Sequence, residues 1–162
     1  MRLPNERKSR EEVTPLATTQ AIDIRPQPGP QEAFLASPAD IVIYGGAAGG
    51  GKSYALLLEP LRHITTVPGF GAVIFRRNAV QVRNEGGLWD TSELLYGPLG
   101  LKPRETVLEW VHVPTGNTVK FAHLEHESTV YDWQGAQVTL LQFDELTHFT
   151  ERQFWYMLSR NR

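Results

Sequence analysis

The chain has 162 residues, 41% hydrophobic and 21% charged, a mixture typical of a globular domain rather than a disordered or fibrous protein. A formal net charge of −2 argues against a nucleic-acid binder that relies on an overall basic charge, so any DNA contact must come from local arginine patches. The lack of cysteine excludes disulfides and thiolate metal sites, and no apolar run reaches the roughly 20 residues that cross a bilayer.

The first 28 residues are polar, carry four prolines and show no sustained apolar period, so we expect a flexible leader there. A folded domain is predicted over residues 29–162. It begins with a short helix over residues 30–35, because Pro30 suits the first turn of a helix and Pro38 prevents its continuation.

The next segments indicate alternating strands and helices. Residues 40–44 form a short β-branched run ended by glycines, which predicts a first core strand buried on both faces. Residues 53–64 carry a wide apolar face and predict a helix, kinked or broken by Pro60 near residues 58–59. Residues 72–75 predict a second core strand.

The second half of the chain continues this pattern. Residues 78–96 predict a helical stretch interrupted at Gly86-Gly87, and residues 106–113 and 117–124 predict a hairpin beside the core strands. A strand over residues 138–143 and a closing helix over residues 150–159, capped by Thr150, follow. This order predicts an α/β domain with a mostly parallel central sheet, flanking helices and an inserted β-hairpin.

A glycine-rich loop stands between the predicted first strand and the helix that follows it, and it matches the phosphate-binding pattern G-x-x-x-x-G-K-[ST]. A polyphosphate surrounded by backbone N–H groups needs residues that tolerate unusual φ and ψ and carry no bulky side chain. We therefore predict an ATP and Mg²⁺ site, with Lys52 on the β- and γ-phosphates and Ser53 on the metal. The loop residues are Gly46, Ala47, Ala48, Gly49, Gly50, Gly51, Lys52 and Ser53.

A second carboxylate-bearing strand is needed to hold the metal of such a site, and residues 138–145 supply an apolar strand that ends in two acids. Asp144 is expected to contact Mg²⁺ through water, and Glu145 to polarise the water that attacks the γ-phosphate. A small-molecule kinase must exclude this water, so Glu145 favours ATP hydrolysis.

With these motifs in order, residues from about 28 to 162 resemble the large terminase subunits of tailed bacteriophages. The resemblance implies a RecA-like (ASCE) P-loop NTPase that hydrolyses ATP to drive double-stranded DNA into a capsid in the host cell cytoplasm. Implied partners are the small terminase subunit, the portal protein and further copies in a ring. Besides the glycine loop and the acid pair, it rests on Pro28-Gly29-Pro30-Gln31-Glu32, Phe75-Arg76-Arg77, Trp133-Gln134-Gly135 and Leu158-Ser159-Arg160-Asn161-Arg162.

The resemblance also implies roles for single residues. Gln31 corresponds to an upstream glutamine that reads adenine through its side-chain amide. An arginine finger or sensor is expected among Arg76, Arg77, Arg160 and Arg162. Several members carry an arginine where this chain has Gln134, and a neutral amide does not offset phosphate charge as a guanidinium does.

Similar full-length proteins continue into a coupling motif and a nuclease domain, and none of that follows Arg162, so nuclease activity is not expected of this chain. Two alternatives stay open at this point. One is another P-loop nucleic-acid ATPase, of helicase or recombination type, and the other is a nucleotide-binding module with little turnover.

Overall fold

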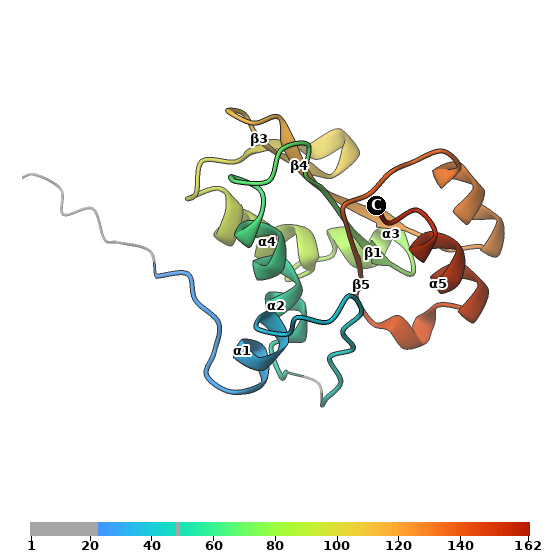
Figure 1. The fold of residues 1–162 in the computed structure, drawn as a ribbon, viewed down its shortest axis with the longest axis horizontal. Coiled ribbons are helices and arrows are strands. Elements are labelled where there is room, and N and C mark those ends of the chain that lie inside the picture. Colours follow the sequence, from blue (N-terminus) through green and yellow to red (C-terminus); the bar gives the residue numbers. More distant parts are fainter. Residues whose placement is uncertain (1–22, 48) are drawn as a thin grey trace, which may run out of the picture.

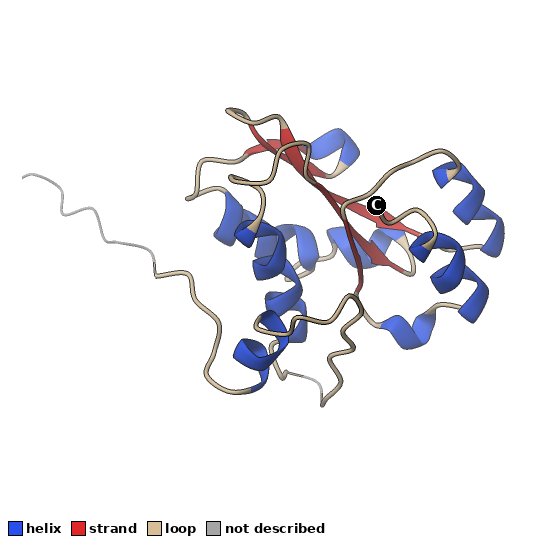
Figure 2. Ribbon diagram, in the orientation of Figure 1, coloured by secondary structure: helices blue, strands red, loops and turns tan. Residues whose placement is uncertain are grey.

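The computed structural model describes residues 23–47 and 49–162, and over these residues the chain forms a five-stranded sheet with helices on both sides (Figures 1 and 2). The strand order is β2-β3-β4-β1-β5. Since β4 and β5 run parallel to β1, and β2 is two antiparallel steps from β4, all strands but β3 point the same way. The predicted α/β class and mostly parallel sheet are confirmed. The strands are β1 (Gly71–Arg76), β2 (Lys102–Arg104), β3 (Glu109–His112), β4 (Asn117–His123) and β5 (Leu140–Phe143).

Most predicted helices are present with close boundaries. Pro60 ends α2 after Leu58, because proline offers no N–H to the helix ladder, and the chain continues as the 3-10 turn η1. Thr150 caps α5, its Oγ1 accepting the N–H of Gln153 at 3.2 Å. The helices are α1 (Pro30–Leu35), α2 (Lys52–Leu58), α3 (Ala79–Arg83), α4 (Leu88–Tyr96) and α5 (Glu151–Leu158), and the 3-10 turns are η1 (Glu59–Arg62), η2 (Glu105–Val107), η3 (Glu127–Trp133) and η4 (Leu146–His148).

Alternate side chains of β1 pack into two apolar clusters, one on each face of the sheet. Ile74 belongs to the cluster that α2 and α4 cover, whereas Phe75 belongs to the cluster that α5 covers (Figure 1). This two-residue alternation is the geometry of a strand buried on both faces. Tyr96 of α4 donates its hydroxyl to Leu57 O at 2.8 Å, and burial raises the pKa of this phenol well above its ordinary value.

The predicted hairpin exists, but it is part of the main sheet rather than an insertion beside it. β3 and β4 pair antiparallel, and β4 also pairs in parallel with β1. The predicted first strand of the hairpin begins late, because Leu108 adopts a left-handed backbone with φ 51° after the turn η2. The additional strand β2 was not predicted.

The predicted core strand over residues 40–44 is wrong, since this segment is irregular and its apolar side chains are exposed. Ile41 is 47% exposed and Ile43 is 74% exposed. A cleft of about 560 Å³ separates the segment from β5, so the edge of β5 offers it no backbone hydrogen bonds. A β-branched run becomes a strand only where a neighbour accepts its N–H groups.

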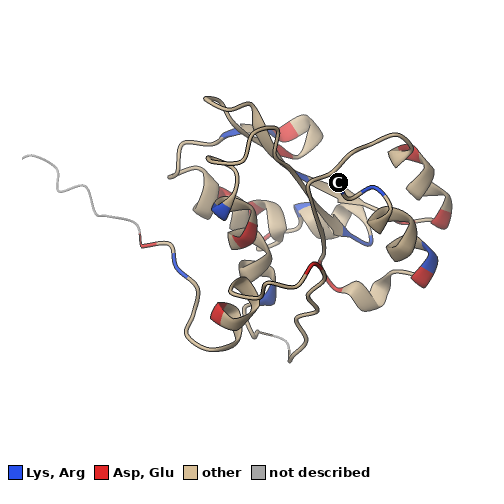
Figure 3. Ribbon diagram, viewed as in Figure 1, with Lys and Arg blue, Asp and Glu red and all other residues tan. Residues whose placement is uncertain are grey.

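The predicted leader, residues 1–28, lies outside the described residues up to residue 22. Among the helices of residues 23–47 and 49–162, none has the length and apolar character that a membrane crossing requires. Lys and Arg positions are spread over both sides of the sheet instead of gathering on one element (Figure 3).

Candidate functional site

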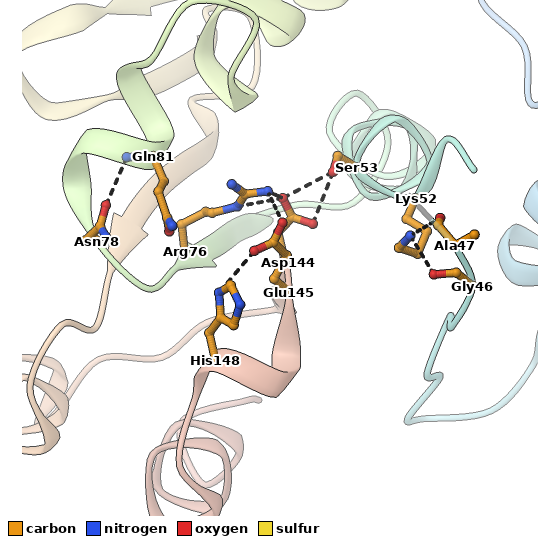
Figure 4. Close-up of polar contacts among 10 residues, drawn as sticks. All are labelled: Gly46, Ala47, Lys52, Ser53, Arg76, Asn78, Gln81, Asp144, Glu145 and His148. Atoms are coloured by element: carbon orange, nitrogen blue, oxygen red, sulfur yellow. Dashed lines mark hydrogen bonds and ion pairs between the residues drawn. The ribbon is translucent and has the colours of Figure 1, made fainter. Parts of the chain in front are cut away.

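The glycine-rich loop leads into α2 with backbone angles that glycine tolerates best. Gly46, Gly49 and Gly51 have φ values of 146°, 79° and 68°. The side chain of Lys52 curls back over the loop, where its Nζ donates to Gly46 O at 3.0 Å and to Ala47 O at 2.7 Å (Figure 4). Its ammonium group therefore lies within the loop that was predicted to bind phosphate. Ala48 lies outside the described residues.

The predicted metal-binding pair meets at the end of the parallel strands. Asp144 follows β5 directly, and its N–H donates to Phe75 O at 2.9 Å, which extends the register between β1 and β5 by one residue. Ser53 in the first turn of α2 donates its hydroxyl to this carboxylate, with Oγ 3.1 Å from Oδ1 and 3.2 Å from Oδ2 (Figure 4). Two residues that are 91 positions apart in the sequence are thus in contact.

Arg76 lies beside the same carboxylates. Its Nε and Nη2 are 2.8 and 2.7 Å from Asp144 Oδ2, and Nη2 is 3.2 Å from Glu145 Oε1. The buried Asp144 is 3% exposed, and an ionised carboxylate at that depth requires a partner of opposite charge. Arg76 supplies that charge and links both acids of the strand end.

Glu145 is held from two sides in an unusual backbone conformation. Its φ of 57° places it in the left-handed region, which costs a non-glycine residue about 1–2 kcal/mol. Arg76 contacts Oε1, and His148 contacts Oε2 through Nδ1 at 3.0 Å. His148 was not predicted as a site residue. The signal in the sequence was the spacing of three residues between Glu145 and His148. The turn η4 brings His148 back beside Glu145, and His148 N donates to Glu145 O at 2.9 Å.

Gln31 lies against the glycine loop. Its side chain is 2% exposed, Nε2 donates to Gly51 O at 2.9 Å, and Oε1 accepts the N–H of Gln27 at 2.7 Å. Both polar ends of the amide are therefore engaged with the backbone. Its predicted role as an adenine reader stays a prediction.

Comparison with known proteins places the chain in a family. A family model described as "Terminase large subunit, T4likevirus-type, N-terminal" matches residues 43–162, a span that includes the glycine loop and both acids. The chain belongs to this family. Neither a curated protein nor a solved structure shows a significant match. The family prediction is confirmed, and with it a general role in packaging viral DNA.

The remaining arginine candidates of this terminase lie elsewhere. Arg77 donates through Nη1 to Leu124 O at 3.1 Å and to Gln153 Oε1 at 2.9 Å, so it ties α5 to the sheet. Arg160 and Arg162 flank the bridge that joins residue 161 to Val138, at the opposite end of β5 from Asp144. These three residues are not brought to the glycine loop of their own chain.

The donors at the terminase site suit Mg²⁺ chemically. The hydroxyl of Ser53 and the carboxylate of Asp144 are hard oxygen donors. Mg²⁺ commonly binds through one or two carboxylates and completes its shell with waters and substrate phosphates. Within residues 23–47 and 49–162, no three His, Asp or Glu side chains gather as a metal cluster, so the protein alone provides only part of a shell.

Proposed function

We propose that this terminase chain is the ATP-hydrolysing motor domain that drives double-stranded DNA into a viral capsid. The contact between Ser53 and Asp144 is the observation that carries the proposal, because it joins the glycine loop to the acidic strand end. On this proposal the chain works in the host cell cytoplasm, in a ring of identical subunits, with the small terminase subunit and the portal protein as partners.

Each part of the site has a distinct task in the proposed reaction. Lys52 exchanges its two carbonyl contacts for the β- and γ-phosphates, since the loop carbonyls are weaker partners for an ammonium than phosphate oxygens. Ser53 and Asp144 would hold Mg²⁺, which when bound neutralises developing charge on the phosphate oxygens. Glu145 orients the attacking water and takes its proton. The fold proposed for this machinery is the P-loop NTPase fold.

A nucleotide-binding module with little turnover is the second candidate. The exposed segment Ile41 to Ile43 favours it, because the chain that enters the glycine loop is not anchored in the sheet. A glycine loop whose entering segment pairs with no strand is expected to bind nucleotide without holding it rigidly for attack.

Binding of a fluorescent ATP analogue and release of phosphate, measured on the 162-residue chain, separate these possibilities. We expect Lys52→Ala to abolish tight binding, and Glu145→Gln to keep binding while losing hydrolysis by about 10²-fold or more. Lys102→Ala, on the exposed strand β2 at the opposite sheet edge, is the matched control. Equal loss of binding in both site variants would refute the assigned roles. Binding without turnover in the parent chain would favour the second candidate.

A further inference from the structure

Arg76 is held beside the two acids by the sheet itself. Phe75 pairs with Phe143 in the parallel register of β1 and β5, so Arg76 and Asp144 are the next neighbours along the two strands. Laterally paired residues of a sheet project from the same face. Two residues after Arg76, the Asn78 side chain accepts the N–H of Gln81 at 3.0 Å and caps α3, which fixes the chain beyond the strand (Figure 4).

The Arg76 guanidinium is largely buried and is paired with carboxylates of its own chain. The Arg76 side chain is 17% exposed, and the side chain of its partner Asp144 is 4% exposed. To reach the nucleotide of a neighbouring subunit, Arg76 would have to move away from Asp144 and Glu145, and the buried carboxylate of Asp144 would lose its counter-charge. The geometry therefore opposes a role for Arg76 as an arginine finger supplied to another subunit.

The charges around the acids indicate what Arg76 does instead. Lys52 points its ammonium at the carbonyls of Gly46 and Ala47, whereas Arg76 is the basic side chain in contact with both acids. An incoming triphosphate meets one net negative charge from Asp144, Glu145 and Arg76 together, and would meet two if Arg76 were neutral. A divalent cation relieves the same repulsion.

We infer that Arg76 acts in cis as a positioning residue that holds Asp144 and Glu145 and limits how strongly nucleotide binding depends on Mg²⁺. The inference rests on the proposed function, because it concerns the same nucleotide site. It assigns Arg76 to the carboxylates of its own chain, and it leaves the finger, if one operates, to another arginine.

The test measures the dissociation constant of a fluorescent ATP analogue in EDTA and in Mg²⁺, and divides the value in EDTA by the value in Mg²⁺. Arg76→Gln keeps a hydrogen-bond donor but removes the charge, and we expect it to raise the ratio about fivefold. Arg76→Lys keeps the charge, and its ratio is expected to stay within about twofold of the parent. Arg83→Gln removes an equal charge from the exposed end of α3 and is expected to leave the ratio unchanged.

Each outcome decides one point. A parent chain that binds no analogue in either buffer refutes the proposed function itself. A parent chain that binds, with an unchanged ratio for Arg76→Gln, refutes only the cis role. Hydrolysis restored by mixing Arg76→Gln with Glu145→Gln subunits would show a finger in trans and overturn the inference. Thermal unfolding without nucleotide checks that each variant is folded, and equal weakening in both buffers would mark a merely structural role.

Discussion

Replacing Gln31 by leucine tests whether this buried amide holds the glycine loop or reads the base of the nucleotide. The amide joins two backbone segments, since it donates to Gly51 O and accepts from Gln27 N. Leucine has a similar volume and no polar atom, so it removes both hydrogen bonds without opening a large cavity. We expect the variant to fold with a less firmly held loop.

The expected loss of stability depends on which hydrogen bonds Gly51 O and the N–H of Gln27 still make in the variant. Gly51 O keeps the bond from Ala55 N at 3.0 Å, and the N–H of Gln27 lies in an exposed residue where water replaces the lost acceptor. The loss therefore falls at the low end for two hydrogen bonds, about 1–2 kcal/mol. In a chain of this size that corresponds to a fall in the melting temperature of about 2 to 8 °C.

Calorimetry and binding titrations with ATP and GTP provide the assay. If Gln31 only tethers the loop, affinity for both nucleotides falls by the same factor, about tenfold. Gln27→Ala is the matched control, because Gln27 takes part through its backbone N–H and keeps that bond. An unchanged melting temperature would contradict the tether, as would a loss of ATP affinity much larger than the loss of GTP affinity, which indicates adenine reading.

Two further predictions concern the same site. Gly51→Ala is expected to lower the free energy of unfolding by at least about 1–2 kcal/mol and to weaken nucleotide binding. The reason is that φ of Gly51 is 68° and the new Cβ would lie 2.2 Å from Gln31 Nε2. Gly45→Ala is the control, since Gly45 has open space around it, and it should be nearly neutral in calorimetry. His148→Ala should slow phosphate release about fivefold, because it removes one of the two contacts that hold the Glu145 side chain. His148→Asn should restore the rate, because its amide nitrogen replaces Nδ1. Equal rates of phosphate release in the two variants would contradict this role.

Local sequence signals were sufficient where the cause of a structure is local. The helix that opens at Pro30, the break at Pro60 and the cap at Thr150 each depend on one residue and its nearest neighbours along the chain, and all are present. The run over residues 40–44 failed for the opposite reason. Its β-branched composition satisfied the local requirement, but pairing depends on a neighbouring strand that composition does not reveal.

The chemical groups of the candidate site can be read from the linear sequence: a glycine loop ending in Lys52 and Ser53, and an apolar strand ending in two acids. The contacts come from the three-dimensional fold, in which Ser53 touches Asp144, Arg76 pairs with the acids of its own chain, and His148 contacts Glu145. Motif spacing depends on order along the chain, whereas charge pairing depends on strand order and register in the sheet, which bring distant residues within a few ångströms.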